Sequence, residues 1–167
     1  MVINIQRIIR HLLSPPWRVR QAFPVHMLRA IESVIRETEE THQGQVRFVV
    51  ETALELMPLL KNQTARERAI ELFSHLRIWD TEQNNGVLIY LLLADHDVEI
   101  IADRAIHNLV GKQSWETICH QMEAAFKQKR FEEGVVAGIR AVSEHLARHY
   151  PGQGIQRNEL PDVPVVL

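Results

Sequence analysis

The chain has 167 residues, of which 46% are hydrophobic and 24% charged, and this size and composition are typical of one globular domain. Its 19 Lys and Arg residues against 21 Asp and Glu residues leave a net charge of −2, which argues against a partner as strongly charged as nucleic acid. The single cysteine, Cys119, cannot form an internal disulfide and fits a reducing compartment. We therefore expect a cytoplasmic protein without a nucleic-acid partner.

The apolar segments are too short to cross a membrane. The longest run without a polar residue, Val87 to Ala94, has eight residues, whereas a spanning helix needs about 20. The first segment, residues 2–13, contains Arg7 and Arg10 and lacks the uninterrupted apolar centre of a secretory signal. The sequence thus predicts no transmembrane segment.

Residues 2–13 instead have the pattern of an amphipathic helix that ends before Pro15-Pro16. We expect this helix to pack on the domain; its apolar stripe consists of Ile5, Ile8, Ile9, Leu12 and Leu13. Two other roles remain open for this segment. One is contact with an unknown protein partner, and the other is a weak peripheral membrane contact of residues 1–20 through Arg7, Arg10, Arg18 and Arg20.

The spacing of apolar residues predicts the remaining helices and strands. Apolar residues recur at three and four positions over residues 24–41, which predicts a helix, and the β-branched residues 46–50 predict a strand. Thr64 and Glu67 have the spacing of a capping box, which predicts that a helix begins there. Two further helices and a surface tail are expected over residues 114–129, 131–149 and 151–167.

The centre of the chain has the pattern of a β-hairpin. Residues 87–94 are uniformly apolar, as in a strand covered on both faces, and residues 98–103 alternate more. Asp95-His96 between them is expected to form a two-residue turn, which places Leu88 opposite Asp103.

This hairpin gathers polar side chains at one end of the predicted sheet. Asp80 ends a helix, Asn85 leads into the central strand, and Asp103 with Arg104 leaves the partner strand at the same end. Carboxylate and amide oxygens are the ligands that Ca²⁺ prefers. We therefore expect Ca²⁺ or another divalent cation at Asp80, Asn85 and Asp103, with Arg104 as a phosphate or structural contact.

The same residues also have an ordinary structural interpretation. Asp and Asn before a strand commonly form turns and caps, and Asp103 with Arg104 can form a surface ion pair. His107 follows this turn and is either an acid or base of a site or an exposed side chain. The chain has no glycine-rich phosphate loop, GxSxG, HExxH or CxxC pattern, so no catalytic residue is assigned and enzymatic activity is left open.

Several motifs together resemble the TPM domain family, and most closely its small, soluble bacterial branch. The resemblance covers roughly residues 25–150 and includes a first strand at Gly44-Gln45-Val46-Arg47-Phe48. The other motifs that carry it are Glu71-Leu72-Phe73, Trp79-Asp80-Thr81, Asn85-Gly86-Val87-Leu88-Ile89-Tyr90, Val98-Glu99-Ile100, Ala102-Asp103-Arg104, Trp115 and Phe131-Glu132-Glu133-Gly134-Val135.

The helix expected over residues 2–13 lies outside this region and is an extra N-terminal helix. The resemblance implies an α/β fold in three layers, with a mixed sheet of about four strands between helices. It divides the chain into an N-terminal helix and linker (1–23), a TPM-like domain (24–150) and a C-terminal tail (151–167). For function it implies either a calcium-binding or accessory module or, by similarity to a thylakoid-lumen relative, a metal-assisted acid phosphatase acting on phosphate monoesters.

Two positions depart from the pattern of the family. Gln45 stands where many members have an acidic residue, which removes a potential anionic ligand, and Ala105 stands where many have glycine. If the chain turns after Asp103-Arg104 with a positive φ angle, as glycine would permit, Ala105 makes that turn less favourable.

Overall fold

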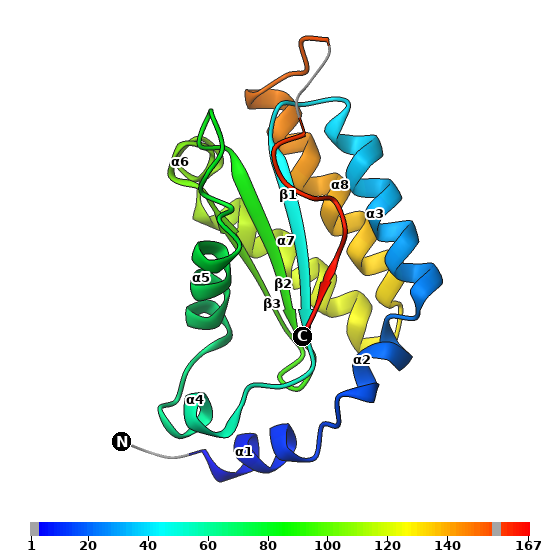
Figure 1. Ribbon diagram of the computed structural model, residues 1–167, viewed down its shortest axis with the longest axis vertical. Helices are drawn as coiled ribbons and strands as arrows, with labels where there is room; N and C mark the ends of the chain where they lie inside the picture. The colour runs from blue at the N-terminus through cyan, green and yellow to red at the C-terminus, as the bar shows by residue number, and fades with distance from the viewer. Residues whose placement is uncertain (1–3, 155–157) are drawn as a thin grey trace.

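The computed structural model describes residues 4–154 and 158–167. Figure 1 shows its elements, which in chain order are α1 (Ile5–Leu12), α2 (Trp17–Ala22), α3 (Val25–Glu39), β1 (Gln45–Glu51), α4 (Leu56–Leu60), α5 (Ala65–His75), β2 (Gly86–Leu92), β3 (Asp97–Ala102), α6 (Arg104–Val110), α7 (Lys112–Lys127), α8 (Phe131–His149) and β4 (Val165–Val166). Within these residues, no helix combines the length and apolar character that a membrane crossing requires.

The strands form one mixed sheet in the order β3-β2-β1-β4. β1 is parallel to β2 and to β4, and β2 is antiparallel to β3. Parallel neighbours need a long crossover connection, and between β1 and β2 this contains α4 and α5. The mixed sheet of four strands is thereby confirmed.

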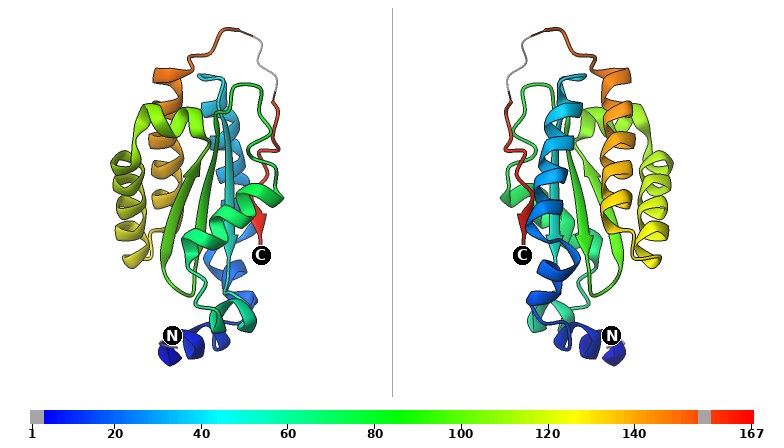
Figure 2. Two further views of the ribbon diagram at one scale, coloured as in Figure 1. Left: turned by 90° about the vertical axis from the view of Figure 1, so that its left-hand side faces the viewer. Right: turned by 90° about the vertical axis from the view of Figure 1, so that its right-hand side faces the viewer.

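Helices cover the sheet on both faces, which confirms the three-layer α/β fold (Figures 1 and 2). On one face, α3, α7 and α8 enclose a core that includes Phe48, Ile89 and Ile100. On the other face, α5 packs over Leu88, Tyr90 and neighbouring side chains. Every residue of β1 and β2 is buried, in agreement with the uniformly apolar pattern of the central strand.

The turn of the hairpin differs from the prediction. Leu92 pairs with Asp97, so the turn contains the four residues 93–96, and Leu88 lies opposite Ile101 instead of Asp103. A two-residue turn of the favoured type needs positive φ at both positions, for which Asp-His is poorly suited. The longer turn needs this conformation only at His96, whose φ is 55°. The register moves by two residues, so each side chain keeps its predicted face.

The two ends of the chain also differ from expectation. The tail contributes the fourth strand, since Val165 and Val166 pair with Val49 and Val50 of β1. The α1 helix lies on the domain, but its apolar stripe does not face it: Ile8 packs against the core, whereas the rest of the stripe is exposed. The helix packs on the domain as expected, but it does so through its charged side, which makes the contacts described below.

Candidate functional site

The start of β2 and the end of β3 meet at one end of the sheet. The backbone N–H of Asp103 donates to the carbonyl of Gly86 at 2.9 Å, which extends the hairpin ladder by one step. Asn85 immediately precedes Gly86, and Arg104 follows Asp103 as the first residue of α6. The structure therefore brings Asn85, Asp103 and Arg104 to neighbouring strand ends, as the sequence predicts.

The segment before β2 is packed tightly against that strand. A Cβ atom at Gly86 would lie 2.1 Å from the carbonyl oxygen of Ile78, so only glycine allows this approach. Asn85 is completely buried as a result. Its backbone N–H donates to Thr81 Oγ1 at 3.2 Å, and its Nδ2 donates to the carbonyl of Gln43 at 3.1 Å. Its Oδ1 is buried and has no hydrogen-bond donor among the described residues.

Asp103 has one satisfied and one unsatisfied oxygen. Oδ1 accepts a hydrogen bond of 2.6 Å from the backbone N–H of Arg104 and caps α6. Oδ2 is buried and finds no donor among residues 4–154 and 158–167. A buried oxygen without a donor costs free energy, and a bound cation or water can remove that cost. Asn85 and Asp103 thus each present such an oxygen near the same strand ends.

An open cleft of about 740 Å³ adjoins Asp103. It lies between α5 and the start of α6, and its lining includes Asn84, Asp103, Arg104 and His107. Arg66 lines it from α5 and forms an ion pair with Glu99 at 2.9 Å. Two arginines and a histidine beside one aspartate give the cleft the donors that an anionic oxygen requires.

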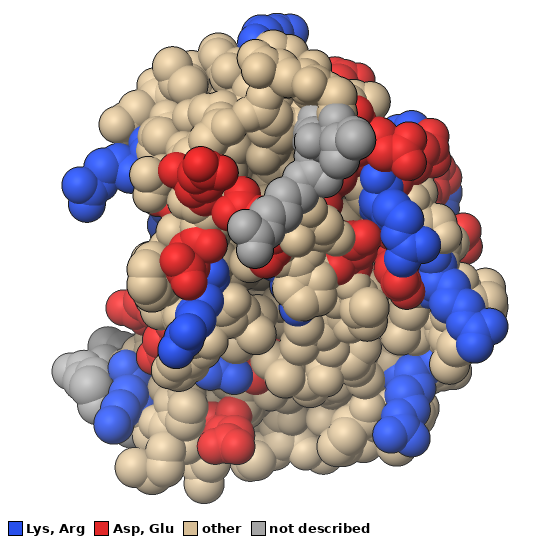
Figure 3. All heavy atoms as spheres, turned by 45° about the horizontal axis from the view of Figure 1, so that its top comes forward, with Lys and Arg blue, Asp and Glu red and all other residues tan. Residues whose placement is uncertain are grey.

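Asp80 lies outside this cleft lining. It is exposed in the loop between α5 and β2, where its backbone N–H donates to the carbonyl of Arg77 at 3.0 Å. Within the described part of the chain its carboxylate makes no hydrogen bond or ion pair. The same loop reaches the C-terminal tail, because the backbone N–H of Glu82 donates to Glu159 Oε2 at 3.0 Å. Asp and Glu side chains gather near the middle of this end in Figure 3.

No group of three or more His, Cys, Asp and Glu side chains within residues 4–154 and 158–167 has an arrangement that could hold a metal ion. The set Asp80, Asn85 and Asp103 contains only two carboxylates. A cation bound there would complete its coordination with amide and backbone oxygens and with water, as Ca²⁺ commonly does.

The structure explains both departures from the family pattern. Gln45 is buried, and its Oε1 accepts hydrogen bonds from the backbone N–H groups of Glu159 at 2.9 Å and Leu160 at 2.8 Å. It therefore holds the C-terminal tail against β1. Ala105 lies inside α6, which begins directly at Arg104. The turn that would disfavour alanine does not form, so that expectation is wrong.

Sequence reasoning missed a buried carboxylate near the same end. Glu39, at the end of α3, is 9% exposed, and its Oε1 accepts a hydrogen bond of 2.7 Å from the backbone N–H of Val46. Burial raises the pKa of Glu39 to about 8, with a smaller contribution from the nearby Asp162 carboxylate. No sequence signal distinguishes Glu39 from an ordinary exposed residue at a helix end, since Glu40 beside it is exposed.

Comparisons with known proteins agree with this architecture. The model of the TPM domain family matches residues 26–145. The NMR structure of the BA42 protein from the psychrophilic bacterium Bizionia argentinensis is similar, with 28% identity, a TM-score of 0.76, and coverage of 87% of this chain and 95% of that one. The N-terminal domain of a protein from P. gingivalis shares the fold, with 14% identity, a TM-score of 0.62, and coverage of 86% and 95%.

No curated protein matches the chain. The family match spans most of the chain, includes the strand ends that carry Asn85, Asp103 and Arg104, and leaves α1, α2 and the C-terminal tail outside. The chain belongs to the TPM domain family.

Proposed function

We propose that this TPM-domain protein is a cytoplasmic accessory module that binds a divalent cation, with Ca²⁺ as the first candidate. The proposed binding site is the end of the sheet that carries Asn85 and Asp103. The observation that supports the proposal best is the pair of buried oxygens, Asn85 Oδ1 and Asp103 Oδ2, that lack donors among the described residues. Buried polar oxygens are nearly always satisfied in folded proteins. A hard cation is a natural partner for an amide oxygen and a carboxylate oxygen together.

The charge of the site predicts its affinity. Asp103 supplies one negative charge, and Asp80 adds a second if its loop moves toward the cation. Calcium affinity increases with the number of charged ligands and with the rigidity of the site, so a site with two carboxylates belongs to the weak class, with a Kd of about 10⁻⁴–10⁻³ M. We expect fast exchange and a requirement for millimolar Ca²⁺.

The position of the site indicates what the cation would do. It would link the loop before β2 to the first residue of α6, two segments that both border the cleft of about 740 Å³. Ordering these segments would fix the shape of the cleft, which then presents a defined surface to a protein partner.

A calcium titration followed by backbone amide NMR tests the proposal. We expect saturable shifts at Asn85, Gly86, Asp103 and Arg104, and their loss in Asp103→Asn. Asp80→Asn is expected to weaken binding severalfold if Asp80 is a ligand. Asp97→Asn is the matched control because Asp97 begins β3 at the opposite end of the sheet. Absence of saturable shifts, or equal titration curves for wild type and Asp103→Asn, would show that the proposal is wrong.

The cleft favours a second candidate, a metal-assisted phosphatase. Arg66 and Arg104 line the cleft beside Asp103, and His107 lines it as well, so a phosphate monoester would find guanidinium donors next to the candidate cation. In this scheme Arg104 neutralises developing charge and Asp103 or Asp80 activates water. Hydrolysis of an aryl phosphate should then depend on a divalent metal and be abolished in Asp103→Asn and Arg104→Gln. Activity that survives in both variants would come from another site or from a contaminant.

A further inference from the structure

The α1 helix is attached to the domain by its charged side. Arg7 Nη2 lies 2.8 Å from Asp95 in the β2–β3 turn, and Arg10 pairs with the other oxygen of the same carboxylate. His11 is buried, its Nε2 lies 3.0 Å from Asp95, and its Nδ1 accepts a hydrogen bond of 2.9 Å from the backbone N–H of Leu54. Arg7 Nη1 also donates to the carbonyl of Gln63 at 2.8 Å.

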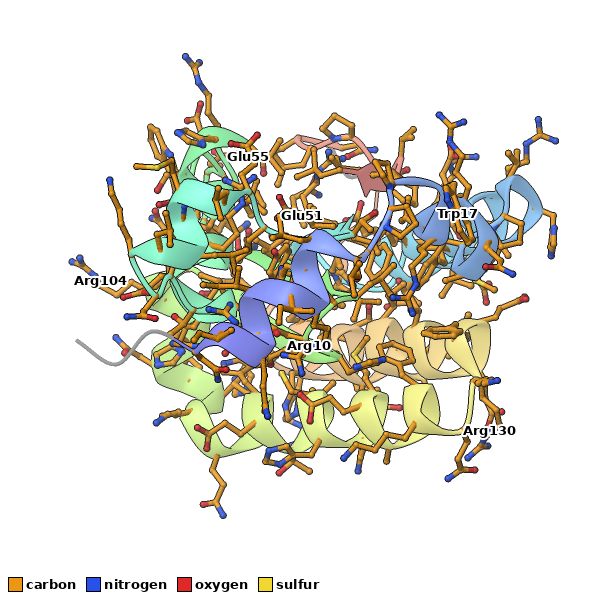
Figure 4. All side chains as sticks on the ribbon, turned by 90° about the horizontal axis from the view of Figure 1, so that it is seen from below. Arg10, Trp17, Glu51, Glu55, Arg104 and Arg130 are labelled. Carbon is orange, nitrogen blue, oxygen red and sulfur yellow. The ribbon has the colours of Figure 1, made fainter. Side chains whose placement is uncertain are left out.

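The apolar side of the helix consequently faces solvent, the reverse of the usual arrangement on a globular domain. We define the N-terminal apolar surface as Ile5, Ile9, Leu12, Leu13 and Trp17, whose exposed fractions are 66%, 50%, 62%, 72% and 60%. In the view of Figure 4, α1 crosses in front of the domain, and Trp17 lies further along the same end. The short helix α4, which contacts α1, adds exposed Leu56 and Met57.

The charge of this part of the chain indicates what the surface contacts. The first 31 residues contain five arginines and no Asp or Glu, although the whole chain has 21 acidic residues. Arg18 and Arg20, which follow Trp17 in α2, are both exposed, and Arg10 is half exposed beside its ion pair with Asp95. Exposed aliphatic side chains with a tryptophan and flanking arginines are the combination that binds the headgroup region of an anionic lipid surface.

We propose that the N-terminal apolar surface attaches this protein peripherally to an anionic lipid bilayer. The α1 helix has eight residues, too few to span a membrane, so the helix lies in the interface with its apolar side toward the acyl chains. Arg18 and Arg20 contact the lipid phosphates, whereas Arg7 and Arg10 hold the helix to Asp95. A second copy of the chain fits the surface less well, because it would bring two arginine-rich segments together.

Vesicle co-sedimentation of the full chain tests the proposal. We expect binding to vesicles made of equal parts of phosphatidylcholine and phosphatidylserine, and at least about tenfold weaker binding to phosphatidylcholine alone. Leu12→Ser with Leu13→Ser should reduce binding to the anionic vesicles at least about tenfold, since both side chains lose their burial in lipid. Arg18→Gln with Arg20→Gln should reduce it severalfold and remove most of its salt dependence.

Matched controls separate this surface from general stickiness. Leu109 on α6 is 54% exposed at the opposite end of the molecule, and Leu109→Ser should leave binding unchanged. In a Trp79→Phe background, Trp17 is the exposed tryptophan because Trp115 is buried, and its emission should shift to the blue on anionic vesicles.

Two results would overturn the proposal. One is equal sedimentation of wild type and Leu12→Ser/Leu13→Ser with anionic vesicles. The other is a wild-type chain that binds neither kind of vesicle and is a dimer in analytical ultracentrifugation, while Leu12→Ser/Leu13→Ser is a monomer. The surface would then be the contact with a second copy.

Discussion

The two ends of the sheet differ in how their polar groups are satisfied. At the end where β1 and β2 finish, which we call the paired end, the buried carboxylate of Glu51 accepts two hydrogen bonds of 3.0 Å from Arg68 and one of 2.7 Å from the hydroxyl of Tyr90. At the end where β1 and β2 begin, Asn85 Oδ1 and Asp103 Oδ2 have no donors among the described residues. Glu39 there is buried without a directly paired cation among the same residues.

This difference separates polar groups that stabilise the fold from polar groups that are available for a ligand. A buried carboxylate with three donors contributes to stability and cannot accept a cation without losing partners. A buried oxygen without a donor costs free energy, and a bound cation or water can remove that cost. Substitutions at the two ends should therefore have opposite consequences for stability and for ligand binding.

The largest effect is expected at the paired end. Glu51→Ala removes the acceptor of Arg68 and leaves the buried hydroxyl of Tyr90 without a partner, so the free energy of unfolding should fall by about 3–5 kcal/mol. Urea denaturation measures this. Glu71→Ala is the control, because Glu71 also contacts Arg68, at 3.4 Å, but is 48% exposed, and it should cost less than about 1 kcal/mol. Equal losses in both variants would contradict the assigned role of Glu51.

The second effect concerns the dependence of stability on pH. Burial raises the pKa of Glu39 to about 8 from the ordinary 4.5, so between these pH values the native state holds a proton that the unfolded chain has released. The free energy of unfolding therefore decreases through this range and levels off above pH 8. Glu39→Gln removes this contribution while its amide oxygen still accepts from Val46. The variant should be more stable than wild type by about 2 kcal/mol at alkaline pH.

Urea denaturation at several pH values checks this expectation. His42 contributes with the opposite sign, because burial lowers its pKa to about 4, and this gain is complete above the ordinary histidine value. His42 contributes equally to Glu39→Gln and to wild type. Its contribution therefore cancels when the free energies of unfolding of the two proteins are subtracted. A difference that does not change between pH 4.5 and 8 would show that Glu39 ionises normally in the native state.

A smaller effect is expected where α1 attaches to the paired end. Asp95→Ala removes the partner of Arg7, Arg10 and His11, but the contacts hold only an eight-residue helix. The free energy of global unfolding should fall by about 1–2 kcal/mol, whereas hydrogen exchange should accelerate strongly in α1 and at the Leu54 amide. Uniform acceleration across the domain would instead mean that Asp95 supports the whole fold.

The sequence predicted those helices and strands whose conformation is decided by residues close to one another in the chain. Thr64 and Glu67 form the expected capping box, and α8 begins at Phe131 and ends at His149 as the apolar spacing indicated. Uniformly apolar residues predicted that the central strand is buried on both faces. In each case residues close in sequence decide the conformation, so no tertiary contact is needed to identify it.

The features that were missed depend on contacts between distant residues. Gln45 holds a residue of the tail that is 114 positions away, and the partner of Arg7 is 88 positions away. Local spacing therefore shows neither the role of Gln45 nor the side that α1 presents to the domain. The contacts of Arg7, Arg10 and His11 with Asp95 hold the polar side of α1 against the domain, and the spacing of its hydrophobic stripe does not show this. At the candidate site, the strand order placed Asn85 and Asp103 correctly because hairpin topology is a local property.

The smallest effect on stability is expected at the candidate site. Its size shows whether Asp103 is a cation ligand or a structural residue. Asp103→Asn keeps an oxygen that can cap α6 and removes a charge that has no donor at Oδ2, so without Ca²⁺ the free energy of unfolding should change by less than about 0.5 kcal/mol. With Ca²⁺ at ten times its Kd, wild type should gain about 1.4 kcal/mol by mass action and the variant almost nothing. Thermal unfolding with and without Ca²⁺ measures both quantities. If Asp103→Asn costs as much as Glu51→Ala, Asp103 is a structural residue like those at the paired end.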